Sequence, residues 1–78
     1  MNPLSKLLNF LCKLEQNKIS YTLEHIRDET IMVTVPLPGQ LWEVEFFENG
    51  DIEVEKFITT TEIGGEELLE DIFSIYAE

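Results

Sequence analysis

The first apolar pattern along the chain has the spacing of an α-helix. Leucine recurs at intervals of three and four residues, which places these side chains on one side of a helix: Leu4, Leu7, Leu8, Leu11 and Leu14. Asn2 can cap the start of such a helix, and Pro3 suits its first position because the N–H that proline lacks has no partner there. With Asn17 as the stop, the pattern predicts a helix over about residues 3–16.

After Asn17 the pattern changes to the two-residue period of β-strands. Alternating or β-branched segments predict four strands, at residues 19–26, 30–35, 41–47 and 52–58. Two prolines in residues 36–39 lack the N–H that a ladder needs, so we expect this segment to break the sheet. Residues 59–62 are expected to leave the sheet before a flexible joint at Gly64 and Gly65.

The sequence between the last two strands is a hairpin signal, and its loop length decides the register. A two-residue Asn49-Gly50 loop would place apolar residues opposite charged ones along the whole hairpin. A three-residue loop that begins at Glu48 keeps one face apolar, and we expect it to form a type I turn with a left-handed Gly50 and a bulge. That register pairs Phe46 with Ile52, Val44 with Val54, and Trp42 with Lys56.

The same register gathers acidic side chains on the other face of the hairpin, where they meet solvent or a partner. Opposed carboxylates destabilise a sheet, so their alignment suggests a docking surface, with Lys56 the cation placed to soften it. Phe47 falls on this face and either anchors a partner or is covered by residues 36–39. The predicted partner-binding residues are Glu43 opposite Glu55, Glu45 opposite Glu53, and Phe47, Glu48 and Asp51 near the turn.

Helical spacing returns near the C-terminus. From Glu66 a broad apolar stripe predicts a helix to about residue 77, comprising Leu68, Leu69, Ile72, Phe73, Ile75 and Tyr76. Acidic residues crowd its first turns, where the helix dipole favours negative charge. The expected fold is therefore α+β and a single domain over residues 1–78. It comprises an N-terminal helix, a four-stranded antiparallel β-meander and a C-terminal helix, with both helices on one face of the sheet.

Charge changes this picture more than composition does. The chain has 16 acidic residues and five lysines or arginines, for a net charge of −11. Such a field repels nucleic acid and anionic membranes and attracts basic protein surfaces, although acidity also serves solubility alone. Cys12 is the one cysteine, which excludes an internal disulfide and favours a reducing cytoplasm.

The sequence carries no pattern typical of catalysis or metal binding. Cys12 is expected in the core because it lies within the leucine stripe, and the single histidine, His25, is expected in solvent or bonded to a turn. One histidine and one cysteine make no zinc site, and the alternating acids from Asp51 to Glu55 lack the glycine and closing glutamate of an EF-hand. We therefore predict no enzymatic activity, no cofactor and no metal.

The hairpin from Trp42 to Phe57, with its alternating glutamates around Asn49-Gly50, resembles small acidic bacterial immunity proteins, which are partners of secreted toxins. Phage-encoded inhibitors of nucleic-acid-targeting defence systems have a similar size and charge. The resemblance implies stoichiometric inhibition of a basic enzyme. The array of carboxylates suggests mimicry of a phosphate backbone, and therefore a partner that handles nucleic acid. Because the overall charge repels both, we expect no direct contact with nucleic acid or membrane, and we expect a monomer or weak homodimer. The alternative is a small adaptor or self-associating structural domain.

Overall fold

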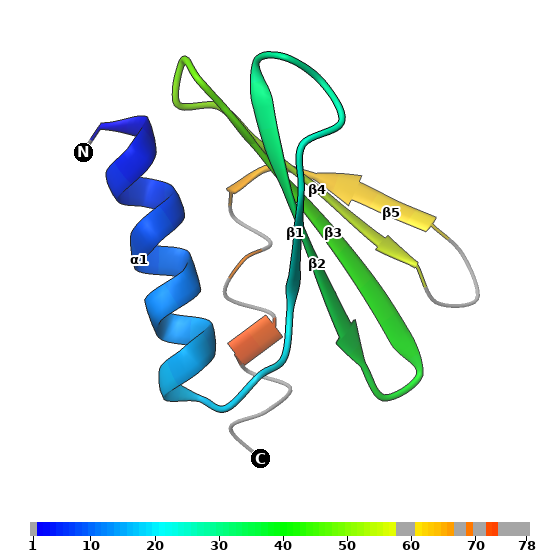
Figure 1. The fold of residues 1–78 in the computed structure, drawn as a ribbon. Helices are drawn as coiled ribbons and strands as arrows, with labels where there is room; N and C mark the ends of the chain where they lie inside the picture. The colour runs from blue at the N-terminus through cyan, green and yellow to red at the C-terminus, as the bar shows by residue number, and fades with distance from the viewer. Residues whose placement is uncertain (1, 58–60, 67–68, 70–71, 74–78) are drawn as a thin grey trace.

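Helix α1 (Pro3–Gln16) packs against one face of an antiparallel sheet in the computed structural model of the chain (Figure 1). The structure describes residues 2–57, 61–66, 69, 72 and 73. The strands of the sheet lie side by side in chain order, as a meander of β1 (Thr22–Glu24), β2 (Thr30–Leu37), β3 (Gln40–Phe47), β4 (Ile52–Phe57) and β5 (Thr61–Gly64). The α+β class is confirmed, and the four predicted strands are joined by a fifth.

The bounds of α1 agree with the prediction because the expected capping residues act as caps. The Asn2 side chain accepts a hydrogen bond from the Ser5 N–H at 2.7 Å, and Pro3 occupies the first helical position. Asn17 closes the other end through its backbone N–H, which reaches the carbonyl of Lys13 at 3.1 Å. The helix start lies beside the β3–β4 turn. A side-chain Cβ at Gly50 of this turn would lie 3.8 Å from the Pro3 ring.

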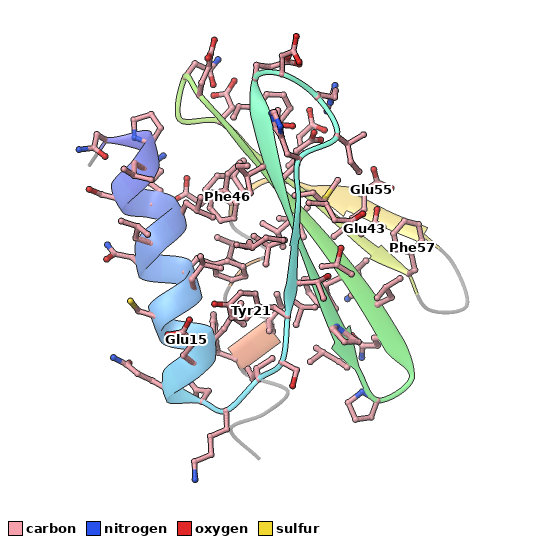
Figure 2. The ribbon with its side chains drawn as sticks, viewed as in Figure 1. Glu15, Tyr21, Glu43, Phe46, Glu55 and Phe57 are labelled. Carbon is pink, nitrogen blue, oxygen red and sulfur yellow. The ribbon has the colours of Figure 1, made fainter. Side chains whose placement is uncertain are left out.

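Strand β1 is shorter than the expected segment 19–26, because the first residues of that segment complete the end of the helix. Lys18 adopts a left-handed conformation, with a φ of 58°, and the Ile19 N–H donates to the Leu14 carbonyl at 2.9 Å. Ile19 is buried in the core instead of joining the ladder. Tyr21 then ties the incoming chain to α1, because its hydroxyl donates to a carboxylate oxygen of Glu15 at 2.5 Å (Figure 2).

The expected break at residues 36–39 is wrong in its extent. Pro36 remains in β2 opposite Leu41, and the turn lies at Pro38 and Gly39, where Gly39 has a φ of 73°. Pairing with β1 reaches only as far as Thr34, so no β1 residue requires the N–H that Pro36 lacks. The proline is tolerated because it lies where β2 has become an edge.

The expectation that residues 59–62 leave the sheet is wrong for residues 61 and 62, since Thr61 begins β5, and residues 59 and 60 lie outside the described residues. This strand pairs antiparallel with β4, with Thr61 opposite Phe57 and Gly64 opposite Val54. Gly64 is thus the last residue of a strand as well as the predicted joint. An open β4 edge can pair with any following segment of high β-propensity, and threonine has that propensity.

The core fills the space between α1 and the sheet. Phe10 of α1 contacts Phe46 of β3 with ring centroids 5.5 Å apart, and Phe73 lies 6.0 Å from Phe10 in an edge-on arrangement. Most of the predicted C-terminal helix falls outside the described residues, but Ile72 and Phe73 are buried in this core and Leu69 packs against it. These residues lie on the α1 side, while α1 leaves the opposite face of the sheet uncovered (Figure 1).

Candidate functional site

The β3–β4 hairpin has the register predicted from its sequence. Phe46 pairs with Ile52, and the Phe47 N–H donates to the Asp51 carbonyl at 2.9 Å. The loop therefore spans Glu48 to Gly50, as expected. The Gly50 N–H returns to the Phe47 carbonyl at 2.9 Å, and Gly50 has a φ of 97°, in the region that favours glycine.

This register aligns the four predicted glutamates on the face opposite α1, which we call the outer face. Glu43 lies directly opposite Glu55, and Glu45 directly opposite Glu53. Figure 2 shows Glu43 and Glu55 on the side of the sheet away from the helix. Glu53 is exposed, whereas Glu43 and Glu55 are half-buried. Two ion pairs in the described part of the chain, Lys6–Glu66 and Arg27–Glu45, do not include these three carboxylates.

Glu45 departs from the prediction because its carboxylate is not available to a partner. Its residue surface is only 7% exposed. Arg27 donates hydrogen bonds to both of its oxygens, one of them at 2.8 Å, and the Thr30 hydroxyl donates to the carboxylate at 2.7 Å. The bonds from Arg27 are the main cause that lowers the pKa of Glu45 below its ordinary value, while burial opposes them.

Phe47 is partly covered, though not by the segment that the sequence suggested. The guanidinium of Arg27 lies 5.2 Å from the centre of the Phe47 ring, so the cover comes from the β1–β2 loop instead of residues 36–39. Phe47 remains half-buried, opposite Thr30 of β2. One arginine therefore fixes this end of the outer face by binding Glu45 and stacking on Phe47.

Lys56, expected to soften the acidic face, lies on the other side of the hairpin from the glutamates. It pairs with Trp42, whose side chain is fully buried on the α1 side, and its ammonium lies 5.2 Å from the centre of the Trp42 ring. The two-residue period explains this placement, because Lys56 shares the parity of Val54 and not that of Glu55. Lys56 thus lies on the α1 side of the hairpin, whereas Arg27 binds Glu45 of the outer face.

The turn carries the last two predicted site residues, and both are exposed. The Asp51 N–H donates to the Asn49 side chain at 2.9 Å, and the Asn49 amide donates to the Asp51 carboxylate at 3.2 Å. The Glu48 N–H donates to the Glu29 carbonyl at 2.9 Å, which ties the turn to the β1–β2 loop. Glu48 and Asp51 therefore extend the acidic surface on a turn braced from two sides.

Beyond the predicted site residues, the outer face includes a carboxylate of β1 and two apolar residues. Glu24 of β1 pairs with Met32, which in turn pairs with Glu45, so the register carries a further carboxylate onto this face. Leu41 pairs with Phe57 beyond Glu43 and Glu55. The sequence does indicate this placement, because Leu41 lies two residues from Glu43, and Phe57 two residues from Glu55, so each pair shares a face of the sheet. The outer face is therefore acidic with apolar side chains at one end.

Cys12 and His25, the remaining candidate groups, both lie on the surface. Cys12 is exposed, which corrects the expectation of a core position: α1 turns its leucine stripe only partly toward the sheet. The His25 ring is exposed and lies 3.4 Å from the Asp28 carbonyl, in agreement with a turn-bonding histidine. Within the described residues, no group of three His, Cys, Asp or Glu side chains is arranged to hold a metal ion. No helix in the described part of the chain is long and apolar enough to span a bilayer.

Comparison with known proteins finds no matching family model, no similar curated protein and no similar solved structure.

Proposed function

We propose that this chain is a non-enzymatic module that binds and neutralises a basic protein through its outer face. The observation that carries the proposal is the direct opposition of Glu43 and Glu55 on a face that α1 leaves uncovered. Like charges opposite one another destabilise a sheet, so this pairing has no benefit for the fold. A lysine or arginine from a partner, placed between the two carboxylates, relieves the repulsion and gains charge-assisted hydrogen bonds.

The charge of the whole chain supports the same partner class. A net charge of −11 steers a positively charged surface toward the chain and increases the rate of encounter. Basic surfaces of this kind occur on proteins that hold phosphate backbones, which is the basis for proposing nucleic-acid mimicry. An immunity protein or an inhibitor of a nuclease-like effector fits this chemistry in the reducing cytoplasm where we propose that it acts.

The apolar end of the outer face adds a second kind of contact. Leu41 is exposed, and Phe57 beside it is half-buried. Protein interfaces combine an apolar centre with charged surroundings, and aromatic residues are enriched among the contacts that matter most. We propose that a partner's basic groups meet Glu43, Glu53 and Glu55, while its apolar atoms cover the Leu41–Phe57 pair.

The test is a comparison of two variants with the same net charge. Affinity capture with the full chain from its native host identifies the basic partner, and titration calorimetry measures its affinity. The variant Glu43→Gln with Glu55→Gln and the control Gln16→Lys with Ser20→Lys both change the net charge from −11 to −9. The control positions are exposed and lie at the far end of α1 and in the following loop.

We expect the first variant to weaken binding by about tenfold or more and the control by much less. Equal losses would mean that only the total charge matters, and the proposed surface would then be wrong.

Self-association is the second candidate function, and one feature of β1 favours it. This three-residue strand is an edge of the described sheet, and Leu23 on it and Ile26 just beyond it are exposed. Exposed edges and apolar side chains promote pairing between chains. The net charge opposes association of two copies, so sedimentation at micromolar concentration decides between a monomer and this alternative.

A further inference from the structure

A groove lies on the α1 side of the sheet, at the end marked by the β3–β4 turn. Its volume is about 550 Å³, and it runs between the first turn of α1 and the β1–β2 loop. Its apolar lining includes Leu4 and Leu7 from the helix, Ile31 from β2 and Phe46 from β3. Phe46 is buried beneath it and points toward α1 (Figure 2), while Leu4 is 63% exposed.

The rim of this groove is acidic. Asp28, Glu29 and Glu48 line it, and its lining in the described part of the chain includes no lysine or arginine, although Arg27 lies nearby over the Phe47 ring. All three are exposed, and the bond from the Glu48 N–H to the Glu29 carbonyl holds the two walls of this rim together. The start of α1 contributes only partial positive charge near the groove, and the Asn2 side chain already accepts the Ser5 N–H there.

We propose that this groove binds an apolar side chain from a segment of the basic partner, with lysines or arginines of the same segment on its acidic rim. The inference rests on the proposed function, because it assigns the groove to the same partner. Apolar side chains gain free energy by leaving water for the leucine, isoleucine and phenylalanine surface. Cations flanking that side chain would be attracted to the carboxylates of Asp28 and Glu48. An acidic or neutral segment would not be attracted in this way.

Charge argues against a second copy of the chain as the occupant. A copy would bring a net charge of −11 toward the three carboxylates of the rim. Electrostatic repulsion would therefore oppose a homodimer through this groove, whereas it favours a cationic segment. The groove also lies beside the turn that carries Glu48 and Asp51, so a partner that binds both the groove and the outer face must extend around this turn.

Model peptides test the groove without knowledge of the partner. The probe is a terminally blocked hexapeptide, Lys-Lys-Leu-Phe-Lys-Lys, added to the ¹⁵N-labelled full chain while amide chemical shifts are recorded. Two further peptides separate the contributions: Lys-Lys-Ser-Ser-Lys-Lys keeps the charge, and Glu-Glu-Leu-Phe-Glu-Glu keeps the apolar pair. We expect the first peptide to shift amides near Leu4, Ile31 and Phe46 and to bind at least about tenfold more tightly than either of the others.

The helix offers a matched pair of variants. Leu4→Gln changes the groove, whereas Leu8→Gln changes a leucine one turn along α1 that is 50% exposed and is not among the groove-lining residues. Both replace an exposed leucine by a good helix former, so both are expected to fold. We expect Leu4→Gln to lower the affinity for the first peptide by about tenfold. Leu8→Gln is expected to change that affinity by less than about twofold.

The rim has its own charge-matched comparison. We expect the double variant Asp28→Asn with Glu48→Gln to lower the affinity for the first peptide. The control variant Gln16→Lys with Ser20→Lys should lower it less, although both variants have a net charge of −9. The proposal is overturned if the two leucine variants have equal effects, if the serine peptide binds as well as the first, or if the shifted amides lie outside the groove. Self-association of the chain that Leu4→Gln abolishes would instead assign the groove to a second copy.

Failure here is separable from failure of the proposed function. If the peptides do not bind but Glu43→Gln with Glu55→Gln still weakens the captured partner, the groove assignment is wrong and the outer face stands. If the peptide binds in the groove but that double variant has no effect on the captured partner, the outer face is wrong.

Discussion

Glu43 of β3 lies directly opposite Glu55 of β4, with both side chains on the face of the sheet away from α1. Both residues are half-buried, which weakens the screening of their repulsion by water. The same register places Val44 opposite Val54 in the core, so the apolar face of the hairpin and the carboxylate alignment have a single origin. A sheet that only needed to be stable would combine this core with mixed charges outside.

Removing the opposed charges should therefore stabilise the fold. We predict that Glu43→Gln with Glu55→Gln increases the free energy of unfolding by about 0.2–1 kcal/mol, because a like-charge pair across two strands is lost. Urea denaturation at neutral pH and low salt measures the change. The charge-matched Gln16→Lys with Ser20→Lys should give a smaller gain. A loss of stability in the glutamine variant would show that these carboxylates support the fold.

Glu45 should behave in the opposite way, because its carboxylate is bound by Arg27 and Thr30. We predict that Glu45→Gln lowers the free energy of unfolding at pH 7 by about 1–2 kcal/mol, since its charge-assisted hydrogen bonds are weakened. Urea denaturation again provides the measurement, with Glu53→Gln as the control on the neighbouring strand. An unchanged or higher stability of Glu45→Gln would contradict the assigned contacts.

The low pKa of Glu45 adds a pH dependence of known sign. A carboxylate whose pKa is lower in the folded state stabilises the fold at pH values above its pKa in the unfolded chain. This stabilisation is lost as the pH falls through the pKa of the folded state. Stability measured from pH 7 downward should therefore begin to fall near the ordinary glutamate pKa and continue below it. Glu45→Gln should reduce the slope, and an identical slope in both proteins would refute the assignment.

Any ordinary side chain at Gly50 should lower stability, because of its backbone angle and not for lack of space. A Cβ on Gly50 would lie 3.8 Å from the Pro3 ring, which is ordinary contact, but its φ is 97°. We predict that Gly50→Ala lowers the free energy of unfolding by about 1–2 kcal/mol through backbone strain. Thermal denaturation measures the loss, and a crystal structure of the variant should retain the Phe46–Ile52 register. A change below about 0.3 kcal/mol would contradict this account of the turn.

The sequence predicted the parts of the fold that local chemistry determines. Asn2 and Asn17 cap the two ends of α1 as expected, since capping depends on residues within one turn of the helix end. The hairpin register followed from the alternation of apolar and acidic residues, because only one loop length keeps Val44 and Val54 on the same side. For the same reason, most of the candidate outer-face residues were found in advance.

The errors arose where long-range contacts determine the outcome. Nothing near Glu45 in the sequence shows that Arg27, 18 residues earlier, folds over it. The β1–β2 loop that carries Arg27 owes its position partly to the bond between Glu29 and Glu48, which depends on the assembled sheet. Likewise, Thr61 joins the sheet because the β4 edge is available beside it. The groove also joins segments distant in the chain, and no local pattern indicates it.

Carboxylate footprinting tests the central claim most directly. Carbodiimide-activated coupling of glycine ethyl ester, read by mass spectrometry, reports the accessibility of each carboxylate in the free chain and in its complex with the captured basic partner. We predict that labelling of Glu43, Glu53 and Glu55 falls by about tenfold or more in the complex, as expected for groups buried under a specific interface, while Glu15 on the far end of α1 changes little. Undiminished labelling of those three glutamates in a saturated complex would contradict the account.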